Sequence, residues 1–415
     1  MSISNALSST PFFPDDRQFW FEAKRAFGAS SYGASEFGEV CATVSRIKSG
    51  DYESWYNEWL ATAERVESEA QRQLAKKHRI SARDSFLRAT TYYRTSEFFL
   101  HGSGHDPRID LAYQKSVECY KACCALYDPP IQPVEIPYEN TTLPGYFHKV
   151  DDSKRKRPLL IIHSGFDGSA EELHSDGARA AVERGYNVLA FDGPGQFGPI
   201  HREGLTFRPD WEKVVSPVVN FAETLPDVDM SKLALMGISL GGVLAPRAAA
   251  FEKRISALIA NDGLYDFGSR VLSTYSKFGS REAVVAALTA AEAPEMDQMI
   301  ERAMEQSTTT AWALRHGMLV FGAATPRAAL AEYLKYHVRD GVAESISCPT
   351  LVLNPDDDLF FKGQPEALYE HLSCPKTMIH FTAAEGAGSH CQAGAARLAY
   401  ARVYDWLDET FGLVG

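Results

Sequence analysis

The feature of this sequence that most constrains its fold is a serine between two glycines, placed where an apolar stretch meets a run of small residues. Residues 234–242 read Ala-Leu-Met-Gly-Ile-Ser-Leu-Gly-Gly, and small residues continue to position 250. A G-x-S-x-G motif between a strand and a helix is typical of a nucleophile elbow, which exposes the serine hydroxyl at a tight turn. Without those flanking elements the same letters would indicate only a chance turn. We therefore predict that Ser239 is a catalytic nucleophile.

Strand and helix patterns alternate around this motif. After a hairpin at 134–147, short apolar strands are expected at 158–163, 186–191, 233–236, 255–260, 349–354 and 377–381, with helices at 170–184, 211–225 and 395–411. Fully apolar strands that alternate with helices predict an α/β fold with a mostly parallel, doubly wound sheet. Functional sites in such sheets form at the carboxyl ends of the strands.

Two further regions have the periodicity of helices. Residues 1–130 show apolar residues at steps of three and four within 54–70, 81–100 and 111–126, and the composition changes at Asp128-Pro129-Pro130. The stretch 263–347 is too long for a plain connection, and it has helical patterns at 283–291, 296–304, 310–319 and 327–337. We expect a helical N-terminal cap domain over 1–130 and a catalytic domain over 131–415, in which 263–347 forms a helical lid.

A serine nucleophile needs a base within hydrogen-bond reach and an acid that orients the base, and in this fold they follow in the order serine, acid, histidine. The strand at 349–354 runs into Pro355 and three aspartates, and the spacing favours Asp358 as the acid. Asp356 and Asp357 remain alternatives, or they cap the next helix. A glycine-rich loop between the last strand and the last helix carries His390, which we expect to be the base.

An oxyanion formed at the serine needs two backbone N–H donors. We expect one from Leu240, directly after the nucleophile, and one from Phe166, in the loop after the first parallel strand, where Gly165 allows close approach. Asp262 and Asp266 follow another strand. Either of these two could bind substrate, or either could only cap the lid.

Other polar residues have structural interpretations. His380 lies inside the last strand and is expected to pack there. His101 and His105 resemble a metal or serine motif, but no strand precedes them, so we expect loop residues. Glu171 and Glu172 open the helix predicted at 170–184, where acidic groups stabilise the helix dipole.

The composition excludes several classes of function. A formal net charge of -12 argues against a nucleic-acid or anionic-membrane surface. The seven cysteines form no disulfide framework, so we expect reduced thiols. Cys119, Cys123 and Cys124 have no histidine nearby at ligand spacing, so we expect no metal there. No cofactor is expected, because the turn at 192–196 lacks the glycine pattern that opens a nucleotide-binding helix. No membrane-length apolar run and no signal-peptide core are found, so we expect a cytoplasmic protein.

The chain resembles α/β-hydrolases, and more narrowly the group that contains 2,6-dihydroxypseudooxynicotine hydrolase and the fungal yellowish-green pigment (heptaketide) hydrolases. The resemblance covers nearly the whole chain and includes the segments 55–59, 92–94, 106–108, 134–138, 143–146, 163–168, 191–196, 237–242 and 390–392. It implies a catalytic triad, which by position falls on Ser239, Asp358 and His390, beneath a helical cap. It also implies a small-molecule substrate and often a homodimer.

For activity, the resemblance implies hydrolysis of a carbon–carbon bond next to a ketone in an aromatic or polyketide-like substrate. The same triad would serve an ester or thioester hydrolase, or an acyltransferase or cyclase of secondary metabolism. A third possibility is a non-catalytic relative that binds a small aromatic ligand, and a complete triad argues against it.

Overall fold

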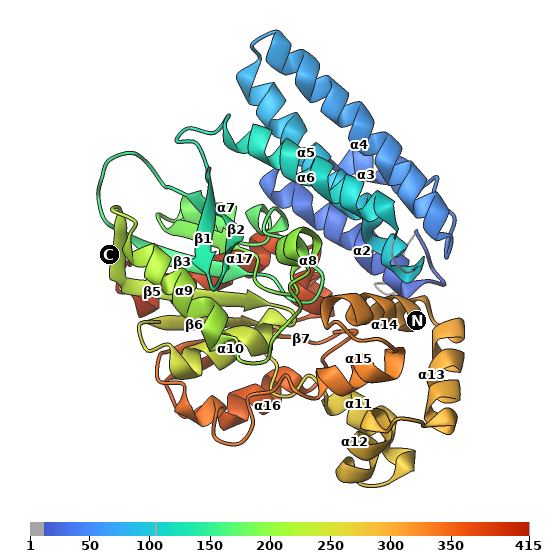
Figure 1. Ribbon diagram of the computed structural model, residues 1–415. Coiled ribbons are helices and arrows are strands. Elements are labelled where there is room, and N and C mark those ends of the chain that lie inside the picture. Colours follow the sequence, from blue (N-terminus) through green and yellow to red (C-terminus); the bar gives the residue numbers. More distant parts are fainter. Residues whose placement is uncertain (1–11, 104–105, 415) are drawn as a thin grey trace.

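A single sheet lies at the centre of the molecule in the computed structural model, which describes residues 12–103 and 106–414 (Figure 1). Its strands are β1 (Gln132–Tyr138), β2 (Thr141–His148), β3 (Arg157–His163), β4 (Asn187–Phe191), β5 (Val228–Ile238), β6 (Ala257–Asn261), β7 (Thr350–Pro355) and β8 (Lys376–Phe381). Within the described residues they pair in the order β1-β2-β4-β3-β5-β6-β7-β8. β1 and β2 are antiparallel to their neighbours, and the other pairs are parallel. The predicted α/β class is confirmed.

Helices cover both faces of the sheet. Those that follow the strands are α7 (Ala178–Glu183), α8 (Phe197–Glu203), α9 (Glu212–Glu223), α10 (Gly241–Phe251), α16 (Gln364–His371) and α17 (Ala396–Thr410). Apolar residues of α9 and α10 form one core with one face of the sheet, and those of α7 and α17 form another core with the opposite face. Strands buried on both faces must be apolar throughout, which is why the sequence shows continuous apolar runs here.

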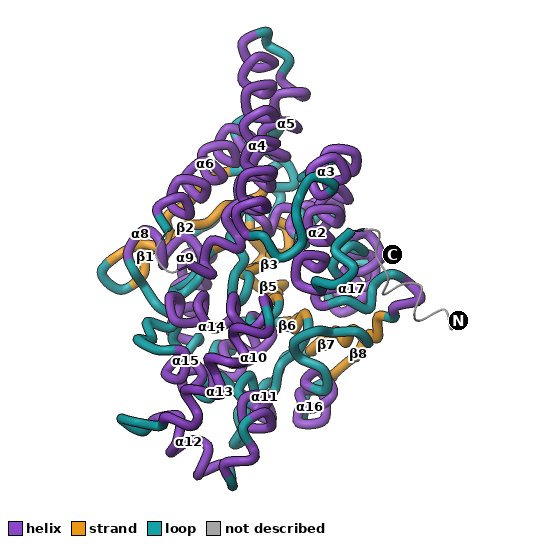
Figure 2. The backbone as a smooth tube through the Cα atoms, turned by 90° about the vertical axis from the view of Figure 1, so that its right-hand side faces the viewer, coloured by secondary structure: helices purple, strands orange, loops and turns teal. Residues whose placement is uncertain are grey.

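The N-terminal helices form a separate layer, which Figures 1 and 2 show stacked beyond one side of the sheet. They are α2 (Arg17–Ala29), α3 (Phe37–Val44), α4 (Tyr52–Ala75), α5 (Arg79–Glu97) and α6 (Pro107–Cys124), with short 3-10 turns η1 (Ser30–Tyr32) and η2 (Phe98–Ser103). Aromatic side chains fill the space between them, and Trp55, Trp59 and Phe99 are fully buried. The apolar spacing that predicted helices thus corresponds to a core of their own.

A second group of helices is inserted between β6 and β7. It comprises α11 (Ser269–Thr274), η4 (Ser276–Phe278), α12 (Arg281–Thr289), α13 (Pro294–Gln306), α14 (Thr308–Val320), α15 (Pro326–Tyr333) and η5 (Ala343–Ser345). The four longer helices were predicted, whereas α11 was not. The inserted helices meet the N-terminal ones at α14, where the Trp312 ring stacks on Phe98 at 4.5 Å and its Nε1 donates to the Phe98 carbonyl at 2.9 Å.

The helix predicted over 170–184 is interrupted. Residues Glu172–His174 form the 3-10 turn η3, and α7 begins only after Gly177. Gly177 has φ 128, which side-chain-bearing residues rarely adopt, so the chain changes direction there. The consequence is that Glu171 and Glu172 lie before the helix rather than in its first turn.

None of the helices in residues 12–103 and 106–414 combines the length and the apolar character that crossing a bilayer requires.

Candidate active site

Ser239 lies on the turn between β5 and α10, as the motif predicts. Its φ is 62, in the left-handed region that is strained for a residue with a side chain. The turn is held to the neighbouring strand, because the Ser239 N–H donates to the Asn261 carbonyl at 3.1 Å. Such strain is a mark of functional positions, and here it exposes the hydroxyl to a cavity that the serine lines.

His390 lies directly opposite this hydroxyl. It occupies the short turn η7 (His390–Gln392) after β8, and its Nε2 is 2.9 Å from Ser239 Oγ. The imidazole is 5% exposed and packs against Phe360 at 4.9 Å and Phe361 at 5.2 Å. Apolar rings cover part of the imidazole, and the histidine is within proton-transfer distance of the serine hydroxyl.

The other nitrogen of the imidazole faces two carboxylates. Asp358 Oδ2 lies 3.1 Å from His390 Nδ1, and Asp262 Oδ2 lies 2.7 Å from the same atom. Asp358 has the position expected of the orienting acid. The two alternative candidates for the acid do not contact His390. Asp356 accepts from the Ala383 N–H at 2.9 Å, and Asp357 is exposed beside Arg17.

The structure corrects our interpretation of Asp262 as a substrate-binding or lid-capping residue. Its side chain is fully buried behind the imidazole, and besides His390 it accepts from the Cys391 N–H and, at 3.0 Å, from the Gln392 side chain. Asp266 does line the cavity. However, its carboxylate accepts from the Gly268 N–H at 3.0 Å and pairs with Arg339 at 3.2 Å, which is the capping alternative.

These contacts shift the pKa of each group. Burial alone lowers the pKa of His390, but the neighbouring Cys391, Asp358 and Asp262 outweigh it and raise the pKa well above its ordinary value. Burial also raises the pKa of Asp262. At Asp358 the attraction of His390 outweighs burial and lowers the pKa. Two negative groups on one nitrogen therefore favour the protonated imidazole that a general base must become during the reaction.

Asp262, His390 and Cys391 also bring three potential metal-ligand atoms within 4.8 Å of one another. Asp262 is already engaged, because it accepts from the Cys391 N–H and from the Gln392 side chain. The remaining contact, between the histidine and the aspartate, is explained by a shared proton. This donor set fits a proton-transfer site better than a metal centre.

The two segments that carry the predicted oxyanion donors approach each other closely at Gly165. A Cβ on Gly165 would be 2.5 Å from the Leu240 nitrogen, so only glycine lets the β3 loop approach the elbow this closely. Among the described residues, the N–H groups of Phe166 and Leu240 have no hydrogen-bond acceptor. The assignment of these two N–H groups as oxyanion donors stays a prediction.

A cavity of about 830 Å³ opens at Ser239. The inserted helices and the loop after β7 supply an apolar wall, which includes Phe267, Leu314 and Tyr333. The N-terminal helix α2 supplies a polar wall with Glu22 and Arg25. A substrate in this cavity would contact aromatic and aliphatic groups on one side and charged groups on the other.

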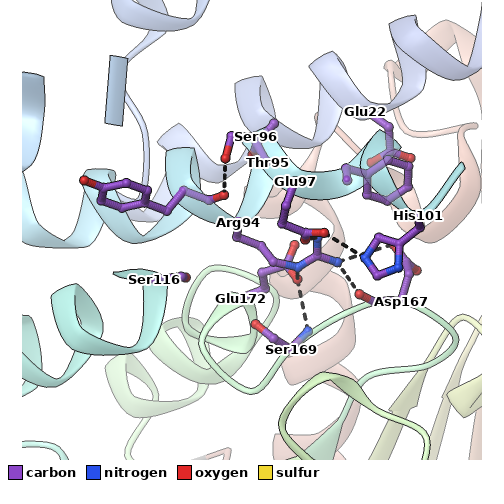
Figure 3. A network of polar contacts seen from close by, with 12 residues as sticks. Glu22, Arg94, Thr95, Ser96, Glu97, His101, Ser116, Asp167, Ser169 and Glu172 are labelled. Atoms are coloured by element: carbon purple, nitrogen blue, oxygen red, sulfur yellow. Dashed lines mark hydrogen bonds and ion pairs between the residues drawn. The ribbon is translucent and has the colours of Figure 1, made fainter. Parts of the chain in front are cut away.

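The polar wall belongs to a buried ion network that the sequence did not predict (Figure 3). Arg25 pairs with Glu22, Asp167 and Glu172 at 3.0, 2.5 and 3.0 Å. Arg94 pairs with Glu172 at 3.0 Å and also donates to the Asp167 carbonyl. The expectation that Glu172 stabilises a helix dipole is therefore wrong. Its partners are the two arginines of α2 and α5.

Burial raises the pKa values of two acids in or beside this network. Burial raises the pKa of Glu22 to about 8, with a smaller contribution from Asp167. Burial and the nearby Glu172 raise the pKa of Asp176 to about 7. Both acids line the cavity and hold a proton over much of the neutral range.

Two histidine predictions are also corrected. His380 lies in β8 as expected, but it is exposed and contacts Asn354 at 3.3 Å rather than packing in a core. His101 lies in η2, where it is buried and hydrogen-bonded to Glu97 at 2.7 Å. Its partner in the sequence motif, His105, lies outside the described residues.

Comparison with known proteins gives consistent matches over the same regions. A model of the alpha/beta hydrolase family matches residues 159–408. The chain is 34% identical to the hydrolase LUC6 of Fusarium sp, with coverage of 95% of this chain and 97% of that protein. It is 35% identical to the 20-hydroxy-prefusarin hydrolase FUS2 of Gibberella moniliformis, with the same coverage of each. Hydrolase acrC of Aspergillus aculeatus is 32% identical, over 96% and 98% of the two chains.

Solved structures share the fold over almost the whole length. The crystal structure of 2,6-dihydroxy-pseudo-oxynicotine hydrolase superposes with a TM-score of 0.70 at 23% identity, covering 92% of this chain and 95% of the other. AbyA5 superposes with a TM-score of 0.63 at 14% identity, covering 90% of each. Both coverages extend beyond the matched family region, so the shared architecture includes helices outside it.

Proposed function

The chain belongs to the α/β-hydrolase family and is an enzyme of the hydrolase class, and on that premise we propose that it uses Ser239 to cleave a carbon–carbon bond beside a ketone in an aromatic or polyketide-like substrate. One observation supports the serine chemistry above all others. His390 Nε2 lies 2.9 Å from Ser239 Oγ while its Nδ1 faces buried carboxylates. This is the geometry in which an imidazole removes the proton of a serine.

In the proposed reaction, Ser239 Oγ attacks the ketone carbon as His390 takes the hydroxyl proton. The carbonyl oxygen becomes an oxyanion that accepts from the Phe166 and Leu240 N–H groups. Collapse of this intermediate breaks the carbon–carbon bond, and the electron pair leaves on carbon as a carbanion or enolate that takes a proton from His390. Water, deprotonated by the same imidazole, then hydrolyses the acyl-serine to the acid and frees the hydroxyl.

Cleavage of a carbon–carbon bond demands more help than cleavage of an ester, because a carbon leaving group is more basic than an alkoxide. The cavity supplies two features that suit it. Its apolar wall fits an aromatic or polyketide-like substrate, and its polar wall carries the protonated acids Glu22 and Asp176. Such acids can donate a hydrogen bond to an enolate oxygen, which stabilises the leaving group.

The proposal is tested with two substrates and one label. The wild-type protein is assayed on an aryl β-diketone and on a p-nitrophenyl ester, and it is treated with a fluorophosphonate probe. We expect cleavage of the diketone and labelling of Ser239. Ser239→Ala should abolish both, while Ser231→Ala, an exposed serine on the same strand, should retain both.

The possible results separate the candidate functions. Absence of labelling at Ser239 in the wild-type protein would contradict the serine mechanism and favour a binding protein. Rapid ester turnover without cleavage of any diketone would contradict the carbon–carbon assignment and favour the ester or thioester hydrolase.

We also propose that the enzyme acts as a homodimer. Large apolar side chains remain exposed on the N-terminal helices, among them Phe37 at 64% and Ile80 at 67%. The proposal follows the family resemblance, which often goes with a homodimer, and these side chains are candidates for the buried face. Light scattering on the purified protein should give twice the chain mass of 45.9 kDa, and a mass of one chain would contradict the proposal.

A further inference from the structure

A chain of three buried hydrogen bonds ends on the loop that carries one oxyanion donor. Glu97 Oε2 lies 2.7 Å from His101 Nε2, and His101 Nδ1 lies 3.2 Å from His316 Nδ1. His316 Nε2 lies 2.8 Å from the carbonyl oxygen of Phe166. Glu97, His101 and His316 are at most 4% exposed, and neither histidine lines the cavity. The mechanism proposed above does not use any of the three.

The carbonyl acceptor at Phe166 fixes the direction of the two hydrogen bonds made by His316. The Phe166 carbonyl can only accept, so His316 carries its proton on Nε2. Burial lowers the pKa of His316 to about 3, so its Nδ1 is bare and accepts from His101 Nδ1–H. Burial lowers the pKa of His101 and raises that of Glu97, so a proton lies between them. His101 thus donates to His316 and His316 donates to the Phe166 carbonyl, and hydrogen bonds aligned in this way strengthen one another.

Phe166 is held from several sides. Its ring packs edge-on against His316 at 4.8 Å. The Ser164 carbonyl, two residues earlier, accepts from Gln196 Nε2 at 2.6 Å, and the Asp167 carbonyl, one residue later, accepts from Arg94. The peptide that carries the Phe166 N–H therefore lies between two fixed points. The bond from His316 is the nearest of these constraints.

We propose that the hydrogen-bonded chain from Glu97 through His101 to His316 positions the Phe166 N–H for the oxyanion, so that His101 and His316 are positioning residues of the reaction. The inference rests on the proposed function, since it presumes an oxyanion at Ser239. Glu97 belongs to α5, His101 to η2 and His316 to α14. The N-terminal and the inserted helices thus both determine the geometry of a donor that belongs to the sheet.

The experiment compares a ligand that mimics the oxyanion with one that does not. An aryl trifluoromethyl ketone forms a tetrahedral adduct with a catalytic serine, whereas the matching aryl methyl ketone binds as a ground-state analogue. In His316→Phe the ring can still stack on Trp312, which lies 5.2 Å away, but the donor to Phe166 is lost. We expect the trifluoromethyl ketone to bind about ten- to a hundredfold more weakly, because a donor aimed at the oxyanion is displaced. The methyl ketone should bind within about twofold of its wild-type affinity, since it gains little from that donor.

Two further variants test the chain itself. His316→Gln provides an amide N–H at the same place and should recover part of the loss. His101→Phe should weaken the adduct in the same direction, because His316 Nδ1 loses its donor. The double variant His101→Phe/His316→Phe should bind the trifluoromethyl ketone almost as well as His316→Phe alone, since both substitutions act through one hydrogen bond.

His201→Phe is the matched control. The His201 ring lies 6.1 Å from the His101 ring, but His201 Nδ1 contacts Asp110, which does not belong to the series of hydrogen bonds from Glu97 to Phe166. This variant should leave the ratio of the two ketone affinities unchanged.

Equal weakening of both ketones in His316→Phe, or no weakening of either, would overturn the inference. If His316→Phe does not fold, His316→Gln and His101→Phe decide the question by the same ratio. A wild-type protein that labels at Ser239 and binds the trifluoromethyl ketone tightly retains the proposed function even if the histidine variants do not change the ratio. If the wild-type protein neither labels at Ser239 nor binds the trifluoromethyl ketone tightly, the proposed function itself is contradicted.

Discussion

At the scale of single residues, the unusual feature is that two carboxylates share one nitrogen of His390. Asp262 follows β6 and Asp358 follows β7, and both lie within 3.1 Å of His390 Nδ1. Either one can keep the imidazole in the tautomer that receives the serine proton. Together they place two negative charges beside a single ring, and this has consequences for both pH dependence and mutation.

We expect Asp262→Asn to shift the pH–rate profile. The neutral form of His390 is the base, and its pKa is raised by the two carboxylates after burial has lowered it. Removing one charge destabilises the imidazolium, so the pKa falls and activity persists to lower pH. The apparent pKa of the acidic limb of kcat/KM should fall by about one unit or more. An unchanged acidic limb would contradict the assigned contact.

We expect the two acids to be partly redundant in rate. Asp358→Asn should reduce kcat/KM by about tenfold to a hundredfold, because Asp262 still accepts from Nδ1. The double variant Asp262→Asn/Asp358→Asn should lose about ten thousandfold, which is the effect of removing the orienting acid in other triads. The values of kcat/KM for the two single variants and the double variant, all measured on one ester substrate, test this redundancy. A loss of ten thousandfold in Asp358→Asn alone would show that Asp262 does not substitute.

The sequence predicted the serine, the histidine and the favoured acid because each follows a strand end by a short and regular spacing. It did not predict the second carboxylate contact, since nothing in residues 261–266 shows which way the Asp262 side chain points. The sequence also placed His101 in a loop, because no strand precedes it. Its partner His316 lies more than two hundred residues away. Contacts that depend on docking of distant helices leave no local pattern.

At the scale of elements, the elbow between β5 and α10 depends on the absence of a side chain at Gly237. A Cβ there would lie 2.1 Å from the Gly241 carbonyl oxygen, and backbone cannot yield as a flexible side chain can. We expect Gly237→Ala to lower the free energy of unfolding by at least about 3 kcal/mol, measured by chemical denaturation. Gly38→Ala, in α3 with open space around it, should be neutral or stabilising by up to about 1 kcal/mol. Equal effects at both positions would contradict this account.

The helix α2 gives the fold a pH dependence of its own. Burial raises the pKa of Glu22 from 4.5 to about 8, so the folded state holds a proton that the unfolded state releases in this window. The contribution of Glu22 to stability is therefore largest near pH 4.5 and decreases as pH rises to about 8. The slope is at most about 1.4 kcal/mol per pH unit. Glu22→Gln should flatten this decrease in denaturation curves between pH 5 and 8, and an unchanged slope would show that Glu22 is ionised when buried.

At the scale of the whole molecule, the N-terminal helices are attached to the sheet through buried charges. Arg94 on α5 bonds with Glu97 on its own helix and with Glu172 and the Asp167 carbonyl in the loops after β3. The alternating patterns of the sequence sufficed to predict both layers. They did not predict this junction, because arginines and glutamates on an amphipathic helix are usually solvent-exposed.

We expect Arg94→Met to lower the free energy of unfolding by about 3–5 kcal/mol, since it leaves buried carboxylates without their partner. Arg88→Met is the control, because Arg88 pairs with Glu39 at 3.0 Å within the N-terminal layer and nearer to solvent. That variant should cost about 1 kcal/mol or less. Denaturation of both variants decides the question, and a cost at Arg94 as small as at Arg88 would mean that the junction does not depend on these charges.

The inserted helices from α11 to η5 form much of the wall around the substrate, and they hold none of Ser239, Asp262, Asp358 and His390. Evolution can therefore revise what the enzyme accepts by exchanging this stretch while the chemistry is inherited unchanged. A chimera that takes the stretch from a relative should acquire the donor's selectivity. The chimera should keep its catalytic rate only if the exchanged stretch has a hydrogen-bond donor at position 316.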